Sequence, residues 1–540
     1  MSMISVLERD WGDGVSSANL GVLETRVGGS IRTTEDQRLK IAIFSSGICY
    51  IVSGTRWDGG TIQVVHGANA AGIDVRHYRE VDQSEIVQIY RGASEAAGAA
   101  PDIDRQIQLA GIIEKAYRSG SSDIHLRVLK DITEVRIRVH GRLQDLETRP
   151  ANEGMPLIKA MFAVASDLDG ASSEISFQQG ALTEASRLLP RGIDMIRLQY
   201  TPESEGRGSV VMRLKPKANP SEVNIDMLGY NRQQMVDIDT MRKRTNGLYI
   251  LAGKVSSGKT TTLQRVLNKM ISEKNREISM YTIEEPKELE LPNAIQHPAR
   301  QLPDGTDGFF LGMKAALRSD LNVIVVGEIR SKMLADLAIQ AVMTGHALWS
   351  TVHAGSALGI LDRLSDFGIE PWKLQDPTVV RGLVYQRLCG VICPHCRVDM
   401  HRAVNDGQLD TQFGAKLSEM FDKPLTDLYI RGPGCPHCKG IGLTGRTVVA
   451  ETCLTDPNLL DLFKKGERMA MRKYWTEDLS SGGMGGTPVM HHAMSKVGAG
   501  ICNIFEIEEE VDLVSSYARD YSHLIPKLAA DARNFNKGTS

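Results

Sequence analysis

Residues 248–260 read Leu-Tyr-Ile-Leu-Ala-Gly-Lys-Val-Ser-Ser-Gly-Lys-Thr, and this stretch decides the fold. Its first five residues are apolar, which is typical of a buried strand, and the pattern G-x-x-x-x-G-K-[ST] follows from Gly253 to Thr260. Beyond the pattern, apolar residues recur with the spacing of one helical face, at Leu263, Val266, Leu267, Met270 and Ile271. A strand, a glycine-containing loop and a helix in this order predict a phosphate-binding loop.

The chemistry of this loop predicts that it binds the phosphates of ATP. Gly253 and Gly258 allow the backbone to wrap so that its N–H groups point at phosphate oxygens, and the start of the helix adds a favourable dipole. Lys259 is expected to bridge phosphates, and Thr260 to ligate Mg²⁺. The alternative is a glycine-containing turn with an exposed lysine, which the flanking strand and helix disfavour. The predicted ATP-binding residues are Gly253, Lys254, Val255, Ser256, Ser257, Gly258, Lys259, Thr260 and Thr261.

Acidic residues follow two further predicted strands. Thr282-Ile-Glu-Glu-Pro places Glu284 and Glu285 at a strand end, and Val323-Ile-Val-Val-Gly-Glu-Ile-Arg places Glu328 at another, as a Walker B element with glycine for the usual aspartate. Phosphoryl transfer to water requires a magnesium ligand and a group that orients the water, and both usually lie at the carboxyl ends of strands. Solvated glutamates at strand ends are the alternative, and it is stronger for Glu285 than for Glu328.

A further strand ends in Ser350-Thr-Val-His353, with Thr344-Gly-His346 just before it. Either histidine alone is more often structural than catalytic. The position of His353 on the strand after Glu328 makes it a candidate sensor of the γ-phosphate.

The remaining pattern indicates several folding units in the 540 residues. Strand-like runs at 247–252, 280–283, 323–326 and 347–352 alternate with helical ones, which predicts a parallel sheet flanked by helices. We expect a small N-terminal domain of unknown role at 1–95, then a small-residue linker from Ala93 to Pro101. An α+β domain should span 103–222, the ATPase core 225–455, and a mostly helical C-terminal region 456–540.

Composition limits the functional classes. The formal net charge is −3, with 42% hydrophobic and 24% charged residues, which is ordinary for a soluble protein and does not indicate a bulk nucleic-acid binder. No apolar run approaches the roughly 18 to 20 residues of a membrane span, and the charged start is not a secretory signal. A cytoplasmic protein is expected, which could dock on a membrane through a partner.

Two identical knuckles, Cys393-Pro-His-Cys396 and Cys435-Pro-His-Cys438, predict a structural zinc site. Each C-x-x-C places two thiolates on one tetrahedral ion, and two pairs complete a closed site. The long spacer predicts a subdomain at about 389–440, inserted into or beside the core. Disulfides are disfavoured in a reducing compartment. The side chains that could substitute as ligands are Cys389, His395 and His437.

Taken together, these residues resemble the secretion ATPase superfamily of type II secretion and type IV pilus assembly, the GspE/PulE/PilB family. The phosphate loop, the acidic box at 282–286, the Val326-Gly-Glu-Ile-Arg run and the histidine box at 344–353 occur in the family's order and spacing. Upstream, Ser122-Asp-Ile-His125 and the stretch 135–141 look like motifs that open its second N-terminal domain. The resemblance covers about residues 105–455. It implies a RecA-like P-loop NTPase core (α/β), preceded by a PAS-like α+β domain.

The resemblance also implies roles for single residues. Glu284 would polarise the attacking water, and Glu328 would support the magnesium and water shell. Arg197 and Arg213 match family arginines that reach the nucleotide from the second N-terminal domain, where an arginine fork stabilises charge on the γ-phosphoryl oxygens. Without the resemblance, both arginines are as easily ordinary residues on a strand surface.

The chain departs from the family pattern at several positions. Lys254-Val-Ser256 stands where the family usually has Pro-Thr-Gly, and Glu285, Ser331 and His140 each stand where it usually has aspartate. No essential functional group is lost. These departures favour a divergent branch, such as a conjugative-plasmid or accessory pilus system.

Three functional hypotheses remain. The first is a homohexameric motor that uses ATP, Mg²⁺ and structural Zn²⁺. It would drive assembly of a type IV pilus or type II secretion pseudopilus through a polytopic inner-membrane platform protein, acting on pilin or pseudopilin only indirectly. A tetracysteine motif accompanies the assembly branch of the family, which favours extension or export. The second is a DNA-translocating conjugation ATPase, although the balanced charge argues against direct nucleic-acid binding. The third is a slow, nucleotide-gated regulatory protein.

Overall fold

The computed structural model describes residues 22–25, 30–31, 33–83, 85–87, 89–90, 101–166, 176–217, 225–274, 277–285, 287, 291–299 and 306–537. The predicted linker that begins at Ala93 lies, except for Pro101, outside these residues, as does Pro286 of the acidic box. The chain divides into two compact units, residues 1–217 and 218–540. The finer domain boundaries inside each unit stay predictions.

A three-stranded sheet forms the first part of the first unit. β1 and β2 are antiparallel, while β2 and β3 are parallel and are joined by a crossover helix. The apolar runs of β1 and β2 are buried against that helix, which explains why they form a small core of their own. The bounds are α2 (Glu35–Arg38), β1 (Ile41–Ile43), β2 (Ile48–Val52), α3 (Gly59–Ala70) and β3 (His77–Val81).

A six-stranded antiparallel sheet with the order β6-β5-β4-β9-β8-β7 follows in the same unit. Val135, Ile137 and Val139 alternate with polar residues along β5, and this period of two buries one face of the strand. The helix and the two strands predicted from periodicity in this region are confirmed as α5, β5 and β8. The bounds are α5 (Pro101–Arg118), β4 (Ser121–Val128), β5 (Ile132–Val139), β6 (Arg142–Pro150), α6 (Ala151–Ala163), β7 (Gln178–Leu182), β8 (Ile193–Pro202) and β9 (Gly208–Pro216).

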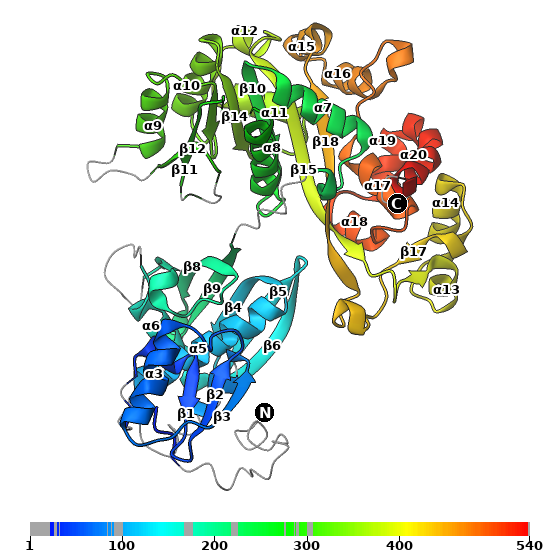
Figure 1. Cartoon of the computed structure of the whole chain (residues 1–540). Helices are drawn as coiled ribbons and strands as arrows, with labels where there is room; N and C mark the ends of the chain where they lie inside the picture. The colour runs from blue at the N-terminus through cyan, green and yellow to red at the C-terminus, as the bar shows by residue number, and fades with distance from the viewer. Residues whose placement is uncertain are drawn as a thin grey trace. The chain divides into compact units, whose positions relative to one another are not determined.

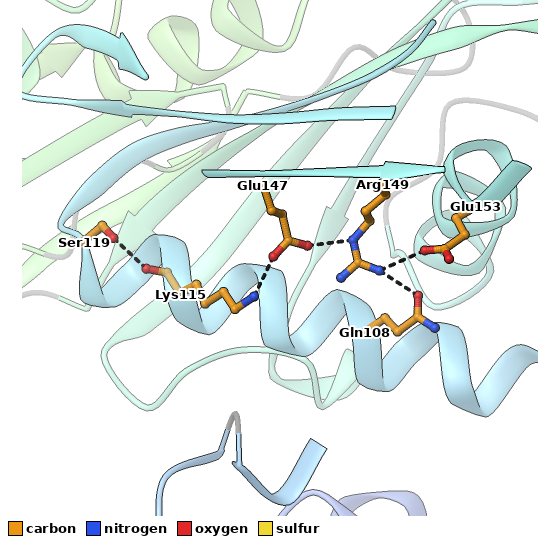
Figure 2. A network of polar contacts seen from close by, with 6 residues as sticks. All are labelled: Gln108, Lys115, Ser119, Glu147, Arg149 and Glu153. Atoms are coloured by element: carbon orange, nitrogen blue, oxygen red, sulfur yellow. Dashed lines mark hydrogen bonds and ion pairs between the residues drawn. The ribbon is translucent and has the colours of Figure 1, made fainter. Parts of the chain in front are cut away.

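A polar network fastens α5 to β6 (Figure 2). Glu147 accepts hydrogen bonds from Lys115 at 2.5 Å and from Arg149 at 2.6 Å, and Arg149 continues to Glu153 of α6 at 3.2 Å. Burial alone would raise the pKa of the Glu147 carboxyl, but the two cations outweigh burial and hold that pKa below its ordinary value.

The second unit is built on a seven-stranded sheet with the order β12-β11-β13-β14-β10-β15-β18. β15 and β18 are antiparallel, and the other pairings in this sheet are parallel, so the predicted parallel sheet is confirmed with one antiparallel edge. The four predicted strands are confirmed as β10, β11, β13 and β14. The bounds are β10 (Gly247–Ala252), β11 (Met280–Glu284), β12 (Ala294–Pro298), β13 (Val323–Val326), β14 (Ala347–Val352), β15 (Val380–Ile392) and β18 (Leu443–Leu454).

Helices cover both faces of this sheet (Figure 1). Along β10, Leu248, Ile250 and Ala252 belong to one hydrophobic cluster, whereas Tyr249 and Leu251 belong to another. A strand that is buried on both faces explains the unbroken apolar run in the sequence. The helices of the second cluster are α7 (Arg232–Lys243) and α8 (Lys259–Glu273), and those of the first are α9 (Gly308–Ala316), α10 (Lys332–Met343), α11 (Gly359–Asp366), α12 (Pro371–Leu374), α15 (Pro457–Lys464) and α16 (Arg468–Thr476).

The segment between β15 and β18 is an insertion at the tip of a long antiparallel hairpin (Figure 1). Its helices pack with the C-terminal helices in a third hydrophobic cluster, and the predicted helical tail is confirmed. None of the helices in the described part of the chain combines the length and apolar character that crossing a membrane requires. The bounds are β16 (Val398–Asp399), α13 (Met400–Asn405), α14 (Thr411–Phe421), β17 (Tyr429–Ile430), α17 (Val489–Gly498), α18 (Ile504–Glu510), α19 (Val514–Asp520) and α20 (Ile525–Lys537).

Candidate nucleotide site and metal centre

The phosphate loop joins β10, which lies between β14 and β15 in the sheet, to the start of α8. Gly253 and Gly258 have φ angles of 154° and 82°, which favour glycine. Gly253 also lies against the neighbouring strand, because a Cβ atom there would lie 2.4 Å from the backbone oxygen of Gln386. Both glycines are therefore needed where the sequence places them.

Ser256 is the strained position of the loop. Its φ is 62°, in the left-handed region that costs a residue with a side chain roughly 1 kcal/mol or more. This is one of the three positions at which the loop departs from the family pattern, and glycine is the residue usually found there. Lys254, Val255 and Ser256 form the exposed rim of the loop.

Lys259, the first residue of α8, reaches back over the loop. Its Nζ donates to the carbonyl oxygens of Gly253 at 2.9 Å and Lys254 at 3.0 Å. The ammonium group is thereby held above the loop backbone, where it can meet a phosphate oxygen. Thr260 is partly buried and Thr261 is exposed in the first turn of α8.

The predicted acidic residues and His353 gather at the edge where the loop lies. β11, β13, β14 and β10 are adjacent and parallel, so their carboxyl ends meet at one edge of the sheet. Glu284 ends β11, Glu328 follows β13, and His353 follows β14. The phosphate loop follows β10 at the same edge. By contrast, His346 precedes β14 at the opposite edge and contacts the Ala341 carbonyl there, at 3.0 Å.

Glu328 and His353 are in direct contact. The His353 Nε2 lies 3.1 Å from one Glu328 carboxylate oxygen, and Arg330 Nε lies 3.0 Å from the other. Glu284 accepts hydrogen bonds from Thr282 at 2.9 Å and, more weakly, from Gln296 at 3.3 Å. Glu328 is therefore oriented by two basic groups.

The two carboxylates of the acidic box differ in their surroundings. Glu284 is half-buried, whereas Glu285 is exposed. Gly327 packs against Glu284, since a Cβ atom at Gly327 would lie 3.7 Å from the Glu284 Cγ. The glycine of the Walker B run is therefore next to the first carboxylate.

Arg197 and Arg213 are directly opposite each other on β8 and β9 of the first unit. Arg213 pairs through Nε with the buried Asp123 of β4 at 2.9 Å, while about half of its own side chain stays exposed. Asp123 belongs to the Ser-Asp-Ile-His run that the sequence singled out. The register thus brings two predicted site residues together, which sequence spacing alone does not show.

Sequence reasoning missed two buried polar residues that hold the loops of the site. Gln386 of β15 donates through Nε2 to the Ser257 carbonyl at 2.8 Å. Glu451 of β18 accepts from the N–H groups of Ala357, at 2.7 Å, and Val489, at 3.0 Å. Burial raises the pKa of Glu451 above its ordinary value, although these donors oppose that shift. Neither residue lies in a recognisable motif, so no sequence signal marks it.

The four knuckle cysteines converge at the tip of the hairpin. Their sulfur atoms all lie within 4.8 Å of one another, and three of the pairs are 3.8 Å apart. A tetrahedral ion with metal–sulfur bonds of about 2.3 Å places its ligands about 3.8 Å apart, so the donor set fits zinc. Backbone N–H groups of Cys435 and Gly442 each point at the Cys438 sulfur at 3.1 Å.

The other candidate ligands stand outside this cluster. Cys389 is buried within β15, and the rings of His395 and His437 are exposed and 4.0 Å apart. In the described part of the chain, the cluster that could hold a metal ion therefore consists of the four knuckle cysteines.

The chain is similar to proteins of known families. The family described as "Type II/IV secretion system protein" matches residues 97–507. Type II secretion system protein E of Dickeya dadantii (strain 3937) is 34% identical over 356 residues, which are 66% of this chain and 66% of that protein. Type II secretion system ATPase E of Vibrio cholerae serotype O1 is 31% identical over 398 residues, which are 73% of each chain. The X-ray structure of the Legionella pneumophila ATPase DotB has a TM-score of 0.51 at 16% identity, covers 75% of this chain and 95% of that one, and shows a shared fold.

Proposed function

The chain belongs to the type II/IV secretion system protein family and is an ATPase, and we propose that it is a homohexameric motor for assembly of a pilus or pseudopilus. ATP hydrolysis would move its domains and so drive pilin or pseudopilin assembly through a polytopic inner-membrane platform protein. The motor itself would work in the cytoplasm, docked on the membrane by that partner.

One observation carries the proposal: a phosphate loop, two carboxylates and a histidine end adjacent strands at one edge of the sheet. Phosphoryl transfer needs phosphates held by backbone N–H groups and a cation, and a water oriented in line with the γ-phosphate. The loop backbone and Lys259 would hold the phosphates. Glu284 would polarise the water.

Magnesium would be held from two sides. Thr260 is the second residue of α8, beside the loop, and Glu328 follows β13, which is two places away from β10 in the sheet. When bound, the ion neutralises charge that develops between the β- and γ-phosphates. The contact between His353 and Glu328 supports a role for this histidine as a γ-phosphate sensor, because a phosphate that attracts His353 would weaken that contact.

Arg197 and Arg213, which belong to the unit of residues 1–217, would supply further positive charge to the nucleotide site. Because they are opposite each other on neighbouring strands, their side chains leave the same face of the sheet, and two such guanidinium groups would suit charge spread over three phosphoryl oxygens. Asp123 would keep the Arg213 fork in position. If both arginines are catalytic, ATP hydrolysis would depend on how the unit that carries them is arranged around the phosphate loop.

Zinc would serve the fold and take no part in hydrolysis. Four cysteine ligands fill the coordination sphere of a tetrahedral ion and leave no position for substrate. Such an ion would join the two ends of the insertion between β15 and β18.

The test is turnover of ATP by the full-length chain with Mg²⁺, compared with Lys259→Ala and Glu328→Gln. Lys259→Ala removes the phosphate-bridging charge and should abolish hydrolysis. Glu328→Gln keeps the shape of the side chain and should bind ATP without hydrolysing it. Lys274→Ala, which removes an exposed lysine at the other end of α8, is the matched control. Wild-type turnover in folded Lys259→Ala would exclude the phosphate-loop assignment.

The hypothesis of a hexameric motor has a separate test. Inactive Lys259→Ala chains mixed with wild type should reduce activity more than in proportion, because subunits of a ring act together. A linear fall would indicate independent sites. Stimulation by DNA, in place of membrane and platform protein, would favour the DNA-translocating alternative.

A further inference from the structure

A buried chain of hydrogen bonds ties the phosphate loop to two residues outside every motif. The side chain of Gln386 is fully buried on β15, beside the loop. Its Nε2 donates to the Ser257 carbonyl at 2.8 Å, and its Oε1 accepts from the Tyr230 hydroxyl at 2.7 Å. The Tyr230 hydroxyl also lies 3.2 Å from the Thr262 hydroxyl in the first turn of α8. The chain therefore joins both ends of the turn between the loop and its helix.

The donors and acceptors available in this chain allow only one direction for each of its three hydrogen bonds. A flipped Gln386 amide would set its oxygen against the Ser257 carbonyl oxygen, so the nitrogen must face that carbonyl. The Tyr230 hydroxyl has one hydrogen, and it is given to Gln386. The bond with Thr262 must then be donated by Thr262. The Tyr230 hydroxyl thus donates once and accepts once, and this orientation satisfies all three bonds.

The bond from Gln386 sets the direction of one peptide unit of the loop. In a trans peptide the C=O and the N–H point in opposite directions. When the Ser257 carbonyl points at Gln386 of β15, the N–H of Gly258 points away from β15. Gly258 caps the start of α8 with a φ of 82°, so its peptide can rotate easily unless a neighbour holds it. Gln386 is that neighbour.

We propose that Gln386 and Tyr230 are positioning residues, which hold the Ser257–Gly258 peptide so that its N–H faces the β-phosphate of bound nucleotide. This rests on the phosphate-binding role proposed above for the loop. Tyr230 acts through Gln386, since its hydroxyl fixes the amide plane and reaches no loop atom itself. Both side chains are buried, so neither is expected to touch the nucleotide or to take part in the chemistry.

The experiment measures ADP affinity and thermal unfolding of the full-length chain. Tyr230→Phe removes only the hydroxyl, and Gln386→Met removes both amide groups with little change of volume. The control is Tyr249→Phe, another buried tyrosine of the same hydrophobic cluster, whose hydroxyl donates to the Asn246 carbonyl before β10, at the far end of that strand. Each variant loses at least one hydrogen bond of a buried side chain, but only Tyr230→Phe and Gln386→Met lose bonds of the chain that reaches the loop.

We expect the Kd for ADP to rise about 10-fold in Gln386→Met and several-fold in Tyr230→Phe, while Tyr249→Phe keeps the wild-type value. The double variant should bind ADP no more weakly than Gln386→Met, because both substitutions act through one amide. An ADP affinity in folded Tyr230→Phe and Gln386→Met equal to that of Tyr249→Phe overturns the proposal. If wild type binds no ADP, or folded Lys259→Ala binds it equally well, the loop assignment fails instead, and the two failures are thereby distinguished.

Discussion

Replacing Gly253 by alanine tests how closely the phosphate loop is fitted to the sheet. The added Cβ would lie 2.4 Å from the Gln386 backbone oxygen and 2.4 Å from the Ser257 hydroxyl oxygen. Ordinary contacts begin at 3.4 Å, so the loop must move by about 1 Å, since the β15 backbone is held by strands on both sides. A displacement of about 1 Å in a catalytic geometry costs on the order of 100-fold in rate. We therefore expect Gly253→Ala to reduce kcat/KM for ATP by about that factor.

The matched control separates this clash from the general cost of a positive φ. Gly466, between α15 and α16, has a φ of 75° and nothing within 4 Å of an added Cβ. Gly466→Ala should lower the free energy of unfolding by roughly 1 kcal/mol and leave hydrolysis unchanged. Steady-state ATPase rates and thermal melts of both variants provide the measurements. If the kcat/KM of Gly253→Ala for ATP lies within about threefold of that of Gly466→Ala, the loop is less constrained than its contacts indicate.

Three further predictions concern the metal, the acid response and the arginines. Protein purified without chelator should hold about one zinc per chain, and Cys435→Ser should lose it; metal analysis that finds none would reject the site. Glu147→Gln should lower the free energy of unfolding at pH 7 by roughly 1 kcal/mol. Because folding lowers the pKa of Glu147, the stability that this carboxylate contributes is present above its unfolded pKa and is lost as the pH falls through its folded pKa. A stability difference between wild type and Glu147→Gln that stays undiminished at strongly acidic pH would contradict this prediction. Arg213→Ala should reduce turnover on the order of 10³-fold. Arg127→Ala removes another ion-paired arginine of the same sheet, and an equal loss there would indicate damage to the fold.

Features with a local cause could be predicted from the sequence. The predicted bounds of β10, β13 and β14 agree with the structure to the residue, because strands buried on both faces are mostly apolar along their whole length. The cysteine cluster followed from the ligand spacing. Glu284, Glu328 and His353 could be placed at one edge of the sheet because each follows or ends a strand, and the predicted strands are parallel. These inferences needed only the neighbouring residues and the direction of the strands.

Features that depend on pairing between distant segments could not be predicted. The antiparallel β18 was not foreseen, since a strand partner across a 50-residue insertion leaves no periodic signal. The same holds for the contact of Gln386 with Ser257, and for the register that sets Arg197 opposite Arg213. Each depends on which strands are neighbours, and that is decided by the whole core.

The hairpin of β15 and β18 runs from the phosphate loop to the cysteine cluster. Because the hairpin is long, the loop and the cluster can be tested independently. Gln386 and Cys393 are seven residues apart in sequence (386 to 393), which at about 3.3 Å per residue is roughly 23 Å along the strand. Between them the two strands pair continuously, with one register shift at Val391. Because a backbone ladder does not depend on the metal, zinc loss should loosen the insertion while Gln386 still holds Ser257. Cys435→Ser should therefore lose zinc and keep its ADP affinity, and a loss of both would show that the hairpin transmits the state of the metal to the phosphate loop.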